Sequence, residues 1–96
     1  MRTKDEILHI LKSHKQRLKE KYGIINLAIF GSYSRGQQTE NSDVDIMVDF
    51  DRPIGIEFID LANEIEKLLK TKVDLVSRNG VRHQYFEQIE QDLNYV

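Results

Sequence analysis

The eight residues from 43 to 50, DVDIMVDF, alternate so that every even position is apolar and three of the four odd positions are aspartate. Successive side chains of a β-strand point to opposite faces of a sheet, so this period of two predicts a strand with one apolar and one acidic face. The apolar face can pack against helices. The face that carries Asp43, Asp45 and Asp49 needs solvent or a cation. The segment therefore predicts a sheet with one buried side and one charged side.

Around this strand the chain reads as helices and short strands. Thr3 and Glu6 have the spacing of a capping box at a helix start, and Gly23 stands where glycine commonly ends a helix. Short β-branched runs predict further strands, and apolar residues at helical spacing predict further helices. The predicted elements are a helix over 3–22, strands over 24–30, 43–50 and 72–76, and helices over 56–70 and 81–93. The predicted fold class is α/β (α+β), with the order α-β-β-α-β-α around a single sheet that helices flank.

Two of these helices carry apolar rows that predict how they pack. In the helix over 56–70 one apolar face carries Ile59, Ala62, Ile65 and Leu69, with Phe58, Leu61 and Leu68 beside it. In the helix over 81–93 the row is Tyr85, Phe86, Ile89 and Leu93. We expect the aromatic residues Tyr85, Phe86 and Tyr95 to close the core of the domain itself. The alternative is that Tyr85, Phe86 and Tyr95 form a surface for a partner, because small domains often leave apolar area to bury.

Length and composition exclude several classes of protein. The 96 residues form one domain, 1–96, and 14 Lys and Arg against 16 Asp and Glu give a net charge of −2. Without a broad basic surface, we expect no direct nucleic-acid binding. The absence of cysteine excludes disulfides, thiolate zinc sites and cysteine nucleophiles. No stretch resembles a signal peptide or a membrane span, so we expect a cytoplasmic protein with no membrane segment.

Three aspartates form the first candidate site. Asp43 and Asp45 lie two residues apart on one strand face, which places their carboxylates about 6–7 Å from each other. Such charges repel unless a cation lies between them, and Mg²⁺ binds carboxylate oxygens while leaving room for phosphate. Asp74 is a lone acid in an otherwise apolar predicted strand, at a position with matching parity. If the two strands are neighbours, the three carboxylates form a two-metal site of the kind that supports phosphoryl displacement.

The second candidate site is the turn GSYSRG at residues 31–36, directly after the first predicted strand. Gly31 lets the backbone approach a ligand closely. Ser32 is expected to cap a short helix that starts there, and its hydroxyl and the nearby N–H groups could bind a phosphate. Arg35 can add a bidentate positive charge. An acidic, metal-binding face beside a phosphate-binding turn indicates a metal–nucleoside triphosphate substrate.

Each piece alone also fits an ordinary role, since Asp-x-Asp is common on solvated strands and Gly-Ser is common in turns. Together they match a known pattern. Gly31-Ser32, ten residues, Asp43-Val44-Asp45 and the later Asp74 resemble the signature of the DNA-polymerase-β-like nucleotidyltransferase superfamily. The short length and the local sequences GSYSRG and SDVDI resemble those of its minimal nucleotidyltransferase (MNT) branch.

The resemblance implies a mixed sheet flanked by helices, with ATP as substrate and two Mg²⁺ ions. It implies that Asp43 and Asp45 hold both metals, and that Asp74 holds the catalytic metal and helps to activate the incoming hydroxyl. It implies that Gly31, Ser32 and Arg35 bind the triphosphate. It also implies an antitoxin that transfers AMP to a tyrosine of a cognate HEPN-domain ribonuclease toxin and assembles with it as a hetero-oligomer.

Two alternatives stay open at this point. One is a nucleotidyltransferase that acts on a small molecule or an RNA end, although the mild negative charge disfavours RNA. The other is a non-catalytic module that neutralises its partner by contact alone. The intact set of Asp43, Asp45 and Asp74 disfavours the second, because clustered carboxylates without a cation destabilise a fold.

Overall fold

A computed structural model describes residues 2–96 as one four-stranded sheet with helices on both sides. The strand order is β3-β2-β1-β4. The central pair, β1 (Ile24–Phe30) and β2 (Val44–Phe50), is antiparallel, and β3 (Val73–Ser77) runs parallel to β2. The short β4 (Asn94–Tyr95) pairs antiparallel with β1. The sheet is therefore mixed, which confirms the predicted fold class.

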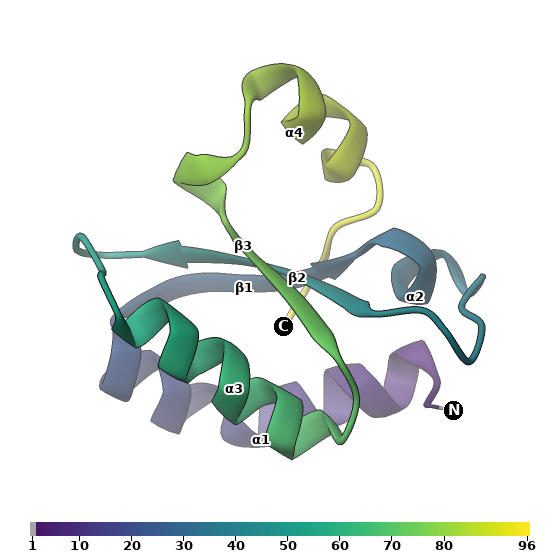
Figure 1. The fold of residues 1–96 in the computed structure, drawn as a ribbon, viewed down its shortest axis with the longest axis horizontal. Coiled ribbons are helices and arrows are strands. Elements are labelled where there is room, and N and C mark those ends of the chain that lie inside the picture. Colours follow the sequence, from purple (N-terminus) through teal and green to yellow (C-terminus); the bar gives the residue numbers. More distant parts are fainter. Residues whose placement is uncertain (1) are drawn as a thin grey trace.

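The helices divide between the two sides of the sheet. The long α1 (Lys4–Tyr22) and α3 (Glu57–Leu69) lie together against one side, and α4 (His83–Glu90) lies on the other (Figure 1). The predicted capping box is present, because Thr3 and Glu6 satisfy each other's backbone N–H groups, and Gly23 ends α1 in the left-handed conformation. Among residues 2–96, no helix is long and apolar enough to cross a membrane.

The core lies between the sheet and the α1–α3 pair. The predicted apolar side of β2 is buried at Val44, Ile46 and Val48. The other buried residues of this cluster with no measurable exposure are Ile7, Leu11, Leu18, Ile29, Leu61, Ile65 and Leu69. The acidic side of β2 faces away from this cluster, and on it Asp45 and Asp49 are partly exposed whereas Met47 between them is buried.

Two expectations about apolar rows are wrong. Ile59 is 60% exposed, because the buried stripe of α3 is Leu61, Ile65 and Leu69, and a residue two positions from Leu61 points to the opposite side of a helix. The last helix is shorter than the predicted 81–93, and none of its residues is buried. It therefore does not close the core. The tail after it returns to the sheet as β4, which was not predicted.

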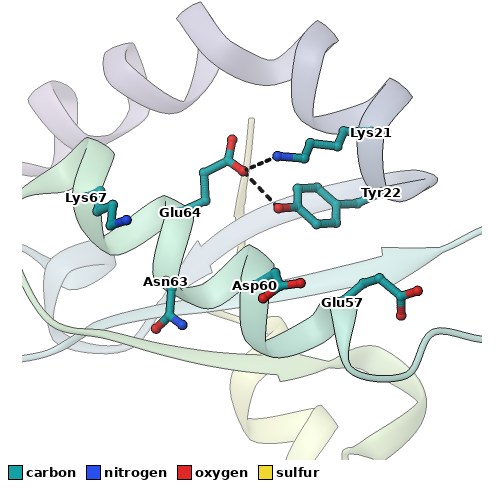
Figure 2. Close-up of a pocket in the computed structure, with 7 residues that line it drawn as sticks. All are labelled: Lys21, Tyr22, Glu57, Asp60, Asn63, Glu64 and Lys67. Carbon is teal, nitrogen blue, oxygen red and sulfur yellow. Dashed lines mark hydrogen bonds and ion pairs between the residues drawn. The ribbon is translucent and has the colours of Figure 1, made fainter.

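A charged cluster ties α1 to α3 outside the core. The Glu64 carboxylate of α3 accepts hydrogen bonds from Lys21 Nζ at 3.0 Å and Tyr22 Oη at 2.8 Å, as Figure 2 shows, and from Arg17. Burial favours a raised pKa for Glu64, but these hydrogen bonds outweigh it and lower the pKa to about 2. The cluster stabilises the pairing of α1 with α3, the two helices that pack against one side of the sheet.

Candidate active site

The acidic side of the sheet is organised by the pairing of β2 with β3. Asp45 and Asp74 are direct partners in this parallel ladder. Neighbouring strands lie about 4.8 Å apart, so the two carboxyl groups start from adjacent positions on the same face. Asp43 lies just before β2 begins at Val44, two residues from Asp45. The structure thus brings the three predicted acids to one end of one sheet face.

The three carboxylates affect one another. Burial, together with the negative charges of Asp74 and Asp43, raises the pKa of Asp45 to about 6, and the positive charge of Arg35 opposes this rise. Asp43 and Asp74 are exposed, whereas Asp45 is partly buried. A carboxyl with a raised pKa among other carboxylates lacks compensating positive charge. The site therefore favours a bound cation.

The donor set fits Mg²⁺ in its chemistry. The side chains of Asp43, Asp45 and Asp74 supply carboxylate oxygens, and these are the ligands that Mg²⁺ prefers. Within residues 2–96, no three acidic or histidine side chains already surround a single point as a ligand set. Asp43 and Asp74 are exposed at the surface, so their side chains are free to change rotamer.

Gly31 forms the link between the acidic face and the following turn. Its φ of +73° turns the chain from β1 directly into α2 (Gly31–Arg35). A Cβ at this position would overlap Oδ2 of Asp45 and lie 3.1 Å from its Cγ. The expected capping role of Ser32 is wrong, because the helix already begins at Gly31, with Phe30 as the cap residue and no side-chain cap. Ser32 therefore lies within the first turn of α2.

Arg35, the last residue of α2, is directed toward the C-terminal tail. Its Nη1 donates to Oδ2 of Asp92 at 2.5 Å, and its Nε donates to Oε1 of Gln37 at 3.1 Å. Next to it, Ser34 is 8% exposed and donates a hydrogen bond to the backbone oxygen of Asp92. Sequence reasoning missed Ser34 and Asp92. Nothing in the local pattern connects residues 57 or 58 positions apart.

A hollow on the helical side is a different feature. It measures about 430 Å³ and lies between the C-terminal end of α1 and α3, around the Glu64 cluster (Figure 2). Its walls carry both acidic and basic side chains from these two helices, and none of the predicted site residues. The candidate active site is thus the exposed acidic face, not this hollow.

Comparison with known proteins places this geometry in a family. A family model described as "Nucleotidyltransferase domain" matches residues 11–95. MJ0126 of Methanocaldococcus jannaschii, which carries a protein adenylyltransferase name, is 47% identical over 98 residues with all of both chains covered. The protein adenylyltransferase MntA of Thermococcus cleftensis is 40% identical, covering 100% of this chain and 98% of its own.

Solved structures agree with the sequence relatives. One described as a minimal nucleotidyltransferase has a TM-score of 0.79 and 29% identity, with 93% of this chain and 92% of the other covered. A toxin–antitoxin structure with AMP-PNP has a TM-score of 0.71 and 26% identity, with 96% of this chain and 70% of the other covered. The chain belongs to the nucleotidyltransferase domain family, as a minimal nucleotidyltransferase of the protein adenylyltransferase type.

Proposed function

We propose that this enzyme transfers AMP from ATP to a tyrosine hydroxyl of a cognate HEPN-domain toxin and so acts as the antitoxin. The observation that carries the proposal is the direct pairing of Asp45 with Asp74 beside the Gly31 turn. This arrangement places a cation-binding face next to a segment that can bind phosphate. The names of the relatives support AMP as the transferred group.

Asp43, Asp45 and Asp74 are the residues proposed to hold two Mg²⁺ ions. Bound there, Mg²⁺ supplies positive charge to the attacking and leaving oxygens of an in-line displacement. Burial and then repulsion from Asp74 and Asp43 raise the pKa of Asp45, and a nearby cation would offset that repulsion, which supports this assignment.

The triphosphate is proposed to bind along α2. Gly31 has no side chain to block its approach, Ser32 offers a hydroxyl and a backbone N–H, and Arg35 offers a positive charge. A fixed guanidinium and oriented N–H groups bind phosphate oxygens well. The α-phosphorus then lies between this segment and the aspartates.

In the transfer step, the acceptor hydroxyl oxygen attacks the α-phosphorus. A new oxygen–phosphorus bond forms as the bond to pyrophosphate breaks, and pyrophosphate leaves. Asp74 is exposed on β3, an edge strand of the sheet, where a hydroxyl of another protein can reach it. We propose that the Asp74 carboxylate accepts the proton of that hydroxyl. Positioning and electrostatics supply most of the rate acceleration.

The proposed partner is based on a solved structure of similar fold and on the family resemblance. A toxin–antitoxin structure that holds AMP-PNP, an ATP analogue, shares the fold at 26% identity. The proposed assembly is a hetero-oligomer of this chain with its toxin. Because ATP is found inside cells, this function places the protein in the cytoplasm.

The test is to incubate the protein with ATP labelled at the α-phosphorus, Mg²⁺ and the product of a neighbouring HEPN-type gene. The proposal predicts that the label appears on the toxin and maps to a tyrosine, and that a tyrosine-to-phenylalanine variant of the toxin stays unlabelled. Tight binding of the toxin without any labelling would point instead to neutralisation by contact. Labelling of an RNA end or a small molecule would replace the protein acceptor.

A further inference from the structure

The guanidinium of Arg35 is held on two sides, by Asp92 at 2.5 Å and by Gln37 at 3.1 Å. Arg35 lies four residues after Gly31 on α2, so the two residues are on the same face of this helix. α2 itself follows directly from β1, whose last residue Phe30 pairs with Asp45 of β2. Arg35 therefore stands between the C-terminal tail and the proposed nucleotide site.

Two donors of this guanidinium are occupied and others remain. An arginine side chain has five N–H donors, and the contacts to Asp92 and Gln37 use Nη1 and Nε. The remaining donors are available to phosphate oxygens. A long side chain that is already fixed loses little freedom when it binds, which favours affinity.

Asp92 is itself fixed, by contacts that do not involve its carboxylate. Its backbone oxygen accepts hydrogen bonds from Ser34 Oγ and from Asn94 Nδ2, the latter at 3.1 Å. Further along the tail, β4 pairs with β1, and the Val96 N–H donates to the Leu27 oxygen at 2.8 Å. The main chain thus anchors the tail, while the side chain of Asp92, 23% exposed, is left to orient Arg35.

We propose that Asp92 is a positioning residue for the nucleotide, whose carboxylate orients Arg35 toward the triphosphate of ATP. This inference rests on the proposed role of Arg35 in nucleotide binding. Asp92 acts on the affinity for ATP and leaves the chemical step to the aspartates of β2 and β3.

The test measures the Kd for AMP-PNP with Mg²⁺ by calorimetry in Asp92→Ala, Arg35→Ala and the double variant. We expect Asp92→Ala to weaken binding by about 3- to 10-fold, as when one flexible side chain has to be ordered on binding. The kcat for AMP transfer at saturating ATP stays within about twofold of the original, because Asp92 touches no reacting group. In the Arg35→Ala background, Asp92→Ala has no further effect. Asp60→Ala, which removes an exposed acid from α3, is the control for the change in net charge.

The outcomes separate this inference from the proposed function. If Arg35→Ala weakens AMP-PNP binding but Asp92→Ala leaves the Kd unchanged or lowers it, the role of Asp92 is overturned and the nucleotide site is kept. An equal loss from Asp92→Ala with and without Arg35 shows an effect through the fold, which also overturns it. Failure of the unaltered protein to bind AMP-PNP overturns both. If Asp92→Ala does not fold, Asp92→Asn keeps an acceptor oxygen without its charge and is expected to weaken binding by a smaller factor.

Discussion

Gly31 provides the space that the carboxylate of Asp45 occupies. A methyl group at Gly31 would overlap Oδ2 of Asp45, and the backbone there has a φ of +73° that side chains disfavour. Two needs therefore coincide at one residue: a sharp turn from β1 into α2, and room for the carboxylate. The proposed phosphate-binding segment and the proposed metal ligand meet at this contact.

The substitution Gly31→Ala tests this contact. We expect a loss of about 1–2 kcal/mol in the free energy of unfolding from the left-handed backbone. We also expect AMP transfer to fall about tenfold or more, because the Asp45 carboxylate is displaced. Gly36→Ala is the matched control, since Gly36 has a φ of +71° and nothing within 4 Å of an added Cβ. It should lose similar stability in urea unfolding and keep its activity. Equal activity losses in both variants would show that the Asp45 contact is unimportant.

Asp45→Asn is expected to stabilise the metal-free protein. The pKa of Asp45 is raised from 3.8 to about 6, so the folded state binds the proton more tightly than the unfolded chain does. The raised pKa therefore does not lower the free energy of unfolding below about pH 4. The loss grows as the pH rises and is complete above about pH 6. Because Asp45 is partly exposed, we expect Asp45→Asn to raise the free energy of unfolding at pH 7 by only about 1 kcal/mol. Unfolding measured between pH 4 and pH 7 tests this, and a variant that is less stable at pH 7 contradicts it.

Mg²⁺ should stabilise the protein through the same aspartates. A ligand that binds only the folded state at ten times its Kd contributes about 1.4 kcal/mol, which raises the Tm of a domain of this size by several degrees. We expect thermal unfolding with added MgCl₂ to show this rise in the unaltered protein and no rise in Asp45→Asn. The same rise in both proteins would place the bound ion elsewhere.

Glu64→Gln tests the cluster between α1 and α3. The pKa of Glu64 is lowered from 4.5 to about 2, so its contribution to stability is full above about pH 4.5 and disappears as the pH falls toward 2. We expect the free energy of unfolding of the variant to fall at pH 7. The loss is limited to about 1 kcal/mol because the partners of Glu64, Arg17 and Lys21, are half exposed. At pH 2 the two proteins should be equally stable. Asp60→Asn on the same helix serves as the control, with little change expected at either pH.

The parts of the fold that depend on local patterns were predictable from the sequence. The alternation in residues 43–50 correctly predicted that Val44, Ile46 and Val48 are buried, although Met47 on the acidic side is buried as well. The capping box at Thr3 and the turn at Gly23 were placed correctly. Matching parity placed Asp45 and Asp74 on the same face on the condition that their strands are neighbours, but the register that makes them direct partners comes from the structure alone.

The parts that depend on long-range contacts were not predictable. The two-residue β4 exists only because the tail meets β1, and the pairing of Arg35 with Asp92 joins residues 57 positions apart. The helix start at Gly31 depends on a positive φ that the motif allows but does not require. Ile59 was misplaced because the apolar residues of α3 can be grouped into more than one stripe.

The most direct test of the central claim compares Asp45→Asn and Asp74→Asn with Asp49→Asn in the AMP-transfer assay, read by intact mass of the toxin. All three exchange a carboxylate for an amide, but Asp49 lies further along β2, opposite Asn26 of β1. We predict that the first two variants add no AMP to the toxin and that Asp49→Asn adds as much as the unaltered protein. Undiminished transfer by Asp45→Asn or Asp74→Asn would contradict the account.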